Sequence, residues 1–251
     1  MSLDCSVVIP AYCEGPRIGK TVRAVREAAE RLDLRIELLV VDDGSLDDTG
    51  GQALAAGAQV VTLDRNSGKG AALQAGFERA AGPVLVMLDG DLGESAGLWP
   101  ALLAPVREGA EMSVARLTPC PEDGAEGIDL AGPGRRNSGG FGWVKGIAAW
   151  GLKRAGGEPM AAPLSGQRAL TRNLWQRIGR LEPGFALEMG LNLDAIRLEC
   201  RVQEVYVAFE HRYTGKDWPG FVHRGRQFRD ILGCLWRRGL IPGFGRRSQR
   251  C

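Results

Sequence analysis

The stretch Val84-Leu85-Val86-Met87-Leu88-Asp89-Gly90-Asp91 decides the fold class of this 251-residue chain. Its five consecutive apolar residues, two of them β-branched, are typical of a strand buried on both faces of a sheet. Asp89 and Asp91 follow where that strand ends, and in open α/β sheets ligands bind beyond the carboxyl ends of the strands. With glycine between them, the two carboxylates can turn to one side and share a hard cation, although the same residues also suit a polar turn.

Strand and helix patterns alternate strictly around this stretch, with short connections between them. Strands are expected over 6–9, 37–41, 59–63, 83–88 and 112–117. Helices are expected over 21–32, 68–80 and 98–106, and a short helix capped by one of residues 47–49 is expected to run to 56. Pro10 is expected to stop the first strand. This alternation predicts an α/β fold with a mostly parallel sheet and helices on both faces. Polar residues follow the first, second and fourth strands, so they should line one crevice at one edge of the sheet.

The alternation ends near Pro119, and residues 121–138 are rich in glycine, proline and charge, which is typical of a loop. Further helices are expected over 137–154, 174–178, 187–198 and 221–236, and further strands over 166–170 and 202–207. We find no internal repeat and no sharp change of composition. The sequence therefore predicts a single domain over 1–251.

The composition is that of an ordinary globular protein, with 44% apolar and 25% charged residues and a net charge of +2. We expect no nucleic-acid partner. The six cysteines are scattered without Cys-x-x-Cys spacing, which gives no zinc-ligand pattern and favours the reducing cytoplasm. A secretory signal and a membrane-spanning stretch are not expected.

Four short blocks lie at the ends of the predicted strands and at one helix start. They are Val7-Val8-Ile9-Pro10-Ala11-Tyr12 with Glu14, Val40-Val41-Asp42-Asp43-Gly44-Ser45 with Asp47-Asp48-Thr49, Asn66-Ser67-Gly68-Lys69-Gly70, and Leu88-Asp89-Gly90-Asp91. In this order and spacing they resemble the nucleotide-sugar half of family 2 glycosyltransferases. The resemblance implies a GT-A fold, which is Rossmann-like, and a UDP- or GDP-sugar donor. No Gly-x-Gly-x-x-Gly follows the first strand, which disfavours a dehydrogenase.

The second half resembles a narrower group through the segments 163–170, 183–191 and 210–212. They are similar to glucosyl-3-phosphoglycerate synthases and mannosylglycerate-type enzymes, and they overlap with polyprenyl-phosphate glycosyltransferases. The resemblance implies a phosphorylated acceptor, either a polyprenyl phosphate or a small acid such as 3-phosphoglycerate. We accordingly divide the chain into a nucleotide-sugar half over 1–118, an acceptor half over 119–220 and a basic amphipathic segment over 221–251.

The resemblance also implies roles for individual residues. The expected donor-binding residues are Pro10, Ala11, Tyr12, Glu14, Asp42, Lys69, Asp89 and Gly90. Asp42 is expected to accept a hydrogen bond from the base, while Asp43 caps the turn at Gly44. Asp89 would contact the ribose or the metal-bound diphosphate. Lys69 begins a helix between two glycines, where its charge suits a phosphate, although a solvated turn lysine is the alternative.

A divalent metal would neutralise the charge that develops on the leaving nucleotide, and Asp91 is the expected ligand. His211, which the resemblance matches to a metal-binding histidine, would be the second ligand of Mg²⁺ or Mn²⁺, with Mn²⁺ slightly favoured. Glu188 would be the general base of an inverting enzyme, or would hold the sugar hydroxyls in a retaining one. The alternative is a surface glutamate.

Ser165, Gly166 and Gln167 are expected in the sugar or acceptor pocket, with Arg168 and Arg136 available for an anionic acceptor.

One departure concerns the donor side: family 2 enzymes usually carry asparagine where this chain has Cys13. A catalytically silent nucleotide-sugar-binding protein is the alternative function. The intact Asp89, Asp91, Lys69 and His211 favour an enzyme.

The C-terminal segment carries a strong positive charge, because ten basic residues and only two acidic ones follow from Arg212 onwards. A basic amphipathic helix with aromatic residues is typical of peripheral contact with an anionic membrane, here the inner face. Alternatively its apolar side packs on the catalytic domain, and its arginines are solvated or bind the phosphorylated acceptor. The membrane interpretation favours a polyprenyl phosphate, and the packed one a small phosphorylated acid. A homodimer is left open.

Overall fold

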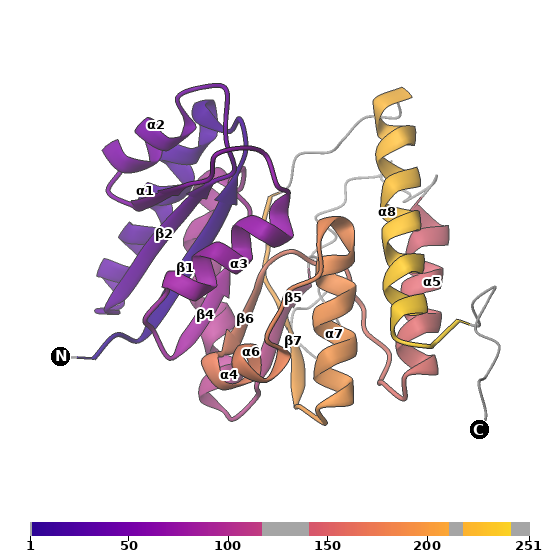
Figure 1. The fold of residues 1–251 in the computed structure, drawn as a ribbon. Helices are drawn as coiled ribbons and strands as arrows, with labels where there is room; N and C mark the ends of the chain where they lie inside the picture. Colours follow the sequence, from indigo (N-terminus) through magenta and orange to yellow (C-terminus); the bar gives the residue numbers. More distant parts are fainter. Residues whose placement is uncertain (1, 117–140, 211–217, 242–251) are drawn as a thin grey trace, which may run out of the picture.

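The computed structural model describes residues 2–116, 141–210 and 218–241, without the side chains of 141–145, 185 and 218–227. Its strands form one seven-stranded sheet in the order β3-β2-β1-β4-β6-β5-β7 (Figure 1). The strands are β1 Cys5–Ala11, β2 Ile36–Asp42, β3 Gln59–Thr62, β4 Val84–Met87, β5 Met112–Arg116, β6 Arg168–Thr171 and β7 Val202–Tyr206. The predicted mostly parallel sheet is confirmed.

One strand runs against the others, and its direction matters for the site. β6 pairs antiparallel with β4 and β5, and Met87 at the end of β4 faces Arg168 at the start of β6. The segment that precedes β6 therefore reaches the same edge of the sheet as the residues that follow β4. In this way a segment of the second half lies beside Asp89.

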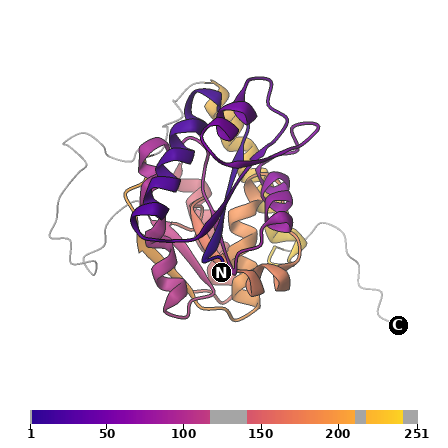
Figure 2. The ribbon, with the colours of Figure 1, turned by 90° about the vertical axis from the view of Figure 1, so that its left-hand side faces the viewer.

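Helices cover both faces of the sheet, as the alternation predicted (Figure 2). On one face lie α1 Gly15–Arg31, α2 Thr49–Ala55, the 3₁₀ helix η1 Gly93–Leu102 and α4 Leu103–Arg107. On the other lie α3 Lys69–Arg79, α6 Arg172–Ile178 and α7 Leu187–Arg197, which follows the short 3₁₀ helix η3 Gly184–Ala186. The odd-numbered residues of β1 pack on the first set and Val8 on the second, as expected for a strand buried on both faces.

Proline is involved in three of the differences between the predicted and the observed boundaries. α1 begins at Gly15 rather than at 21, because Pro16 suits a first helical turn. The helix expected over 98–106 is divided between the end of the 3₁₀ helix η1, which contains Pro100, and α4. β1 does not stop at Pro10 but pairs with β2 through Ala11. Alternate residues of a strand direct their backbone groups to the same neighbouring strand, so Pro10, like Val8, faces β4. β4 has already ended at the level of Pro10, so the N–H that proline lacks costs the sheet no hydrogen bond.

A further layer of two helices, α5 Phe141–Arg154 and α8 Trp218–Arg237, packs on the outer side of α7 (Figure 1). Ile231, Cys234 and Leu235 of α8 are buried there. For the described part of α8, this confirms that the apolar side packs on the catalytic domain. None of the helices in the described ranges is long and apolar enough to cross a bilayer.

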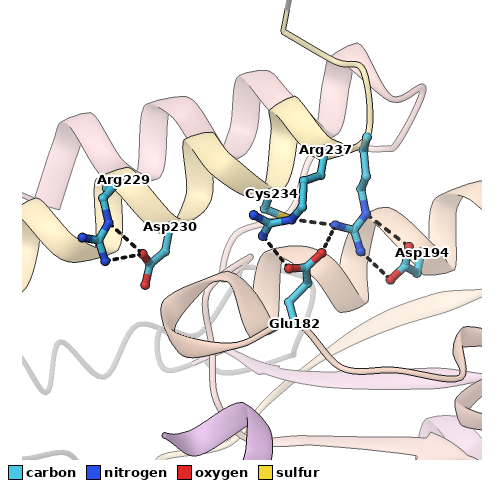
Figure 3. A network of polar contacts seen from close by, with 7 residues as sticks. Glu182, Asp194, Arg229, Asp230, Cys234 and Arg237 are labelled. Carbon is cyan, nitrogen blue, oxygen red and sulfur yellow. Dashed lines mark hydrogen bonds and ion pairs between the residues drawn. The ribbon is translucent and has the colours of Figure 1, made fainter. Parts of the chain in front are cut away.

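Ion pairs fix the C-terminal end of α8 against α7 and against the segment that leads into it (Figure 3). Arg237 and Arg238 contact the Glu182 carboxylate at 2.6 Å and 2.5 Å, and Arg238 also contacts Asp194 at 2.7 Å. Burial alone raises the pKa of Glu182, but the two guanidinium groups outweigh it and hold that pKa below its ordinary value. These two arginines therefore serve the fold, whereas Arg229 is largely exposed and contacts its neighbour Asp230.

The close approach of α3 to the sheet can be tested at Gly76. A Cβ on this residue would overlap the Val8 side chain and lie 2.9 Å from Val41 Cγ2, and both valines are rigid and buried. We expect Gly76→Ala to lower the free energy of unfolding in urea by about 1–3 kcal/mol. The control is Gly146→Ala in α5, where no described atom lies within 4 Å of the added Cβ and a gain of up to about 1 kcal/mol is expected. Equal effects of the two substitutions would contradict the packing described.

Candidate functional site

The predicted site residues gather at the edge of the sheet where β1, β2 and β4 end and β6 begins. Tyr12, just after β1, is 43% exposed there, whereas Ala11 is buried. Glu14 N–H donates to Thr49 Oγ1 at 2.9 Å, and Cys13 N–H donates to Ser45 Oγ at 2.9 Å. The loop after β2 therefore holds the loop after β1, so the two predicted donor-binding segments form one wall.

The two carboxylates after β2 have different partners. Asp42 Oδ1 accepts the Ser45 N–H at 2.9 Å, so Asp42 caps the turn that Asp43 was predicted to cap. Asp43 instead accepts the N–H groups of Ser67 and Gly68, both at 2.7 Å. Asp43 thereby fixes the loop that leads into α3 and to Lys69. The contact of Asp42 with a base stays a prediction.

Lys69 lies between two carboxylates from different parts of the chain. Its Nζ is 2.7 Å from Asp89 Oδ1 and 3.0 Å from Glu188 Oε1. Burial alone lowers the pKa of Lys69, but the two ion pairs outweigh it and raise this pKa above its ordinary value, so the ammonium is charged at neutral pH. The solvated-lysine alternative for Lys69 is wrong, and so is the surface alternative for Glu188, which is only 8% exposed.

The segment before β6 completes this cluster. Gln167 Nε2 donates to Asp89 Oδ2 at 2.6 Å, and Ser165 Oγ contacts Gln167 Oε1 at 3.3 Å. Gly166 passes so close that a Cβ would lie 2.6 Å from Lys69 Nζ and 2.9 Å from Asp89 Oδ2. The structure therefore brings the predicted segment 165–167 to Lys69 and Asp89, and only glycine fits at 166 without displacing them.

Arg168 does not have the role predicted for it. It is fully buried, and its guanidinium donates to the carbonyl oxygens of Ser165 and Pro163 at 2.8 Å and 2.9 Å and to Asn192 Oδ1 at 2.5 Å. It therefore holds the backbone of 163–167 and is not available to an anionic acceptor. Burial lowers the pKa of Arg168, although the group stays charged at neutral pH. Asn192 was not predicted as a site residue, although its position four residues after Glu188 places both on one face of α7.

Asp91 lies apart from this cluster, in a cavity of about 530 Å³. The cavity is lined by Pro16, Arg17, Lys20, Asp91, Leu92, Gly93, Glu94 and Glu210. Both oxygen atoms of Asp89 are engaged, Oδ1 by Lys69 and Oδ2 by Gln167, and a cation shared by Asp89 and Asp91 stays a prediction. Of the pair, Asp91 is the carboxylate open to the cavity.

The residues around Asp91 fit a metal only in part. Within the described ranges, no three carboxylate, histidine or cysteine side chains form a complete metal site. A half-exposed carboxylate in an open cavity nevertheless fits the way Mg²⁺ is commonly held, by one or two carboxylates together with substrate phosphates and water. The predicted ligand His211 and the predicted acceptor residue Arg136 lie outside the described residues.

Residues 6–133, which include β2 to β5 and all of β1 except Cys5, match the family described as Glycosyl transferase family 2. The chain belongs to this family. Membership confirms the resemblance that the four sequence blocks predicted.

Two kinds of family 2 relatives are similar to the chain over different lengths. Glucosyl-3-phosphoglycerate synthase of Mycolicibacterium paratuberculosis is 29% identical over 258 aligned residues, which cover 96% of this chain and 74% of that protein. Undecaprenyl-phosphate 4-deoxy-4-formamido-L-arabinose transferase of Pseudomonas syringae is 36% identical over 113 residues, 43% of this chain. The chain spans about a third (34%) of the length of that transferase.

Solved structures of glucosyl-3-phosphoglycerate synthase from Mycobacterium tuberculosis have the same fold. The complex with Mg²⁺ and UDP superposes with a TM-score of 0.74 at 25% identity, over 97% of this chain and 82% of that one. The complex with Mn²⁺, UDP-glucose and phosphoglyceric acid gives 0.70 at 26% identity, over the same shares. The GT-A fold predicted from the sequence is thereby confirmed.

The Lys69 ion pairs predict a measurable contribution to stability. Lys69→Met leaves Asp89 and Glu188 without their shared cation, so we expect the free energy of unfolding to fall by about 1–3 kcal/mol. Because the pKa of Lys69 is raised by folding, this contribution is complete below the ordinary lysine value of about 10.4 and is lost only above the raised pKa. The loss should therefore be constant from about pH 6 to pH 9 in urea titrations.

Two further variants make this test specific. Lys153→Met, an exposed lysine of α5, should change stability by less than about 0.5 kcal/mol. The double variant Lys69→Met/Glu188→Gln should recover part of the lost stability, because it removes one of the two carboxylate charges that are left without a cation. A Lys69→Met protein as stable as the Lys153→Met protein would refute the assigned pairing.

Proposed function

We propose that the protein is a metal-dependent glycosyltransferase that moves a hexosyl group, glucose in the first instance, from a UDP-sugar to a small phosphorylated acid such as 3-phosphoglycerate. One observation carries this choice of acceptor. The similarity to glucosyl-3-phosphoglycerate synthase extends over 96% of the chain and so includes its second half, whereas the match to the undecaprenyl-phosphate transferase covers 43%. The donor assignment rests on the UDP and UDP-glucose named in the related structures.

The described part of α8 supports an acceptor dissolved in water over a lipid-linked one. Ile231, Cys234 and Leu235 are covered by α5 and α7, and Arg237 and Arg238 are paired within the protein. The apolar and basic groups that a membrane surface would attract are thus already engaged at this end of the helix. A polyprenyl phosphate remains the alternative acceptor.

On the donor side, we assign Pro10, Ala11, Tyr12, Glu14, Asp42 and Gly90 to the wall that holds the nucleotide. Asp91 would hold Mg²⁺ or Mn²⁺, the ions of the related structures, and His211 stays the predicted second protein ligand. Such an ion, when bound, stabilises the charge that develops on the leaving diphosphate. Lys69, fixed by Asp89 and Glu188, adds a second positive charge at the same edge of the sheet.

On the sugar and acceptor side, we assign Ser165, Gly166 and Gln167 to the pocket wall and Arg136 to the acceptor phosphate. Glu188 Oε1 accepts a hydrogen bond from Lys69. A carboxylate already engaged by an ammonium group is better suited to orient sugar hydroxyls than to remove a proton from the acceptor. We therefore favour a retaining reaction, with Glu188 as the residue that orients the transferred sugar.

A release assay tests the donor and the acceptor together. The purified protein with Mn²⁺ is given UDP-glucose or GDP-glucose, each with 3-phosphoglycerate or with undecaprenyl phosphate in detergent micelles. We expect nucleotide release and a glucosylated product only from UDP-glucose with 3-phosphoglycerate. Turnover restricted to undecaprenyl phosphate would refute the proposed acceptor, and turnover restricted to GDP-glucose would refute the donor.

Asp91→Asn tests the metal assignment. We expect kcat/KM at saturating Mn²⁺ to fall by about 100-fold or more, because the charge on the leaving group loses its counter-ion. The free energy of unfolding should change by less than about 0.5 kcal/mol, since no hydrogen bond to this carboxylate is found within the described ranges. Asp64→Asn, an exposed carboxylate in the loop after β3, is the control. Equal activity of the two variants would exclude Asp91 as a ligand.

Thiol labelling tests the donor wall without catalysis. Cys13 is exposed between Tyr12 and Glu14, whereas burial raises the pKa of Cys5 to about 12 and that of Cys234 to about 11. We expect iodoacetamide to label Cys13 in the native protein and to spare Cys5 and Cys234, as followed by peptide mass spectrometry. UDP with Mn²⁺ should slow the labelling of Cys13 several-fold. Cys200, partly exposed after α7, is the internal control and should keep its rate.

A further inference from the structure

The turn that carries Asp91 is held from one side by the hydroxyl of Thr21. Thr21 lies on α1 and is fully buried. Its Oγ1 donates to the Gly90 carbonyl oxygen at 2.8 Å and accepts the Gly93 N–H at 2.9 Å. These two backbone groups bracket Asp91 in the chain, so a single hydroxyl fixes the turn before and after the carboxylate.

A second hydroxyl holds the same turn from the other side. Ser95 Oγ donates to the Leu92 carbonyl oxygen at 2.7 Å and accepts the Glu210 N–H at 3.0 Å. Glu210 follows β7 and lines the cavity with Asp91. Thr21 therefore ties the Asp91 turn to α1, and Ser95 ties it to the end of β7; we call these two side chains the hydroxyl clamp.

The clamp acts where regular secondary structure gives no support. β4 ends at Met87, its last bond to β1 runs from the Leu88 N–H to the Val8 carbonyl at 3.2 Å, and η1 begins only at Gly93. Thr21 and Ser95 thus serve backbone groups on both sides of Asp91 in the gap between strand and helix. Without the Thr21 hydroxyl, the Gly90 carbonyl oxygen and the Gly93 N–H lose their hydrogen-bond partner, and the turn must move to find other partners.

We propose that Thr21 and Ser95 are positioning residues for a divalent metal, which act by holding the Asp91 backbone. The proposal rests on the proposed function, in which Asp91 is a metal ligand. Groups that orient a metal ligand without touching the metal typically contribute 10- to 100-fold to its affinity. The clamp is neutral, so it fixes the position of Asp91 without competing for its charge.

Mn²⁺ binding in the presence of saturating UDP, measured from the free Mn²⁺ signal in electron paramagnetic resonance, gives a readout that does not depend on turnover. We expect Thr21→Val and Ser95→Ala to weaken Mn²⁺ binding by about tenfold. Thr21→Ser keeps the hydroxyl and should stay close to the wild type.

Thr171→Val is the matched control. Thr171 Oγ1 accepts the Leu174 N–H at 3.1 Å as the cap of α6, and it pairs with Val84 at the opposite end of β4. This variant loses a backbone hydrogen bond by the same substitution but lies far along β4 from Asp91. It should lower thermal stability and leave Mn²⁺ binding unchanged.

The outcomes separate this inference from the proposed function. Mn²⁺ binding lost in Asp91→Asn but unchanged in folded Thr21→Val and Ser95→Ala would overturn the clamp alone. Equal weakening in Thr171→Val would overturn it too, since general destabilisation would then be the cause. If Thr21→Val does not fold, the Mn²⁺ affinity of Ser95→Ala decides whether the clamp positions Asp91. A wild type that binds no Mn²⁺ with UDP, or an Asp91→Asn variant that binds it normally, would overturn the metal assignment and the clamp with it.

Discussion

The site depends on one ammonium group that two distant carboxylates share. Lys69 begins α3, Asp89 follows β4 and Glu188 lies in the first turn of α7, so the ion pairs join segments 119 residues apart in the chain. The three side chains are each less than a third exposed, and the pairs are therefore screened by water less than surface pairs are. Each partner limits where the others can lie, and this fixes the second half of the chain against the first.

The antiparallel β6 makes that arrangement possible. A parallel strand beside β4 would bring its carboxyl end to the edge of the sheet where Asp89 lies and send the segment before it to the opposite edge. Because β6 runs the other way, the backbone of 163–167 reaches Asp89, and buried Arg168 holds this backbone through two carbonyl oxygens. An arginine that is buried and fully engaged is retained here for the shape of a loop, and its conversion to a smaller residue would leave those carbonyls unpaired.

How far the sequence predicts this structure depends on the range of the interactions involved. The buried strands, the helices on both faces and the position of Asp91 at a strand end all follow from local apolar patterns. The direction of β6, the burial of Arg168 and the partners of Lys69 do not, because an apolar pattern carries no strand direction and the pairs join distant segments. Asp42 and Asp43 illustrate the limit: adjacent carboxylates look alike in sequence, and only the folded loops show that one caps its own turn and the other holds the next loop.

The outer helix α8 supports the Lys69 cluster indirectly, through its contacts with α7 and with the segment before α7. Arg237 at the end of α8 and Arg238 just after it hold Glu182, which lies just before η3 (Figure 3). η3 leads directly into the first turn of α7, which carries Glu188. Removing this layer would expose Met189 and Leu193, which pack on α5 and α8, and would release the segment that sets the direction of Glu188. The basic residues at this end of α8 are thus part of the support for the Lys69 cluster. At Arg237 and Arg238, a charge pattern that suggests an outward-facing surface in the sequence instead forms ion pairs within the fold.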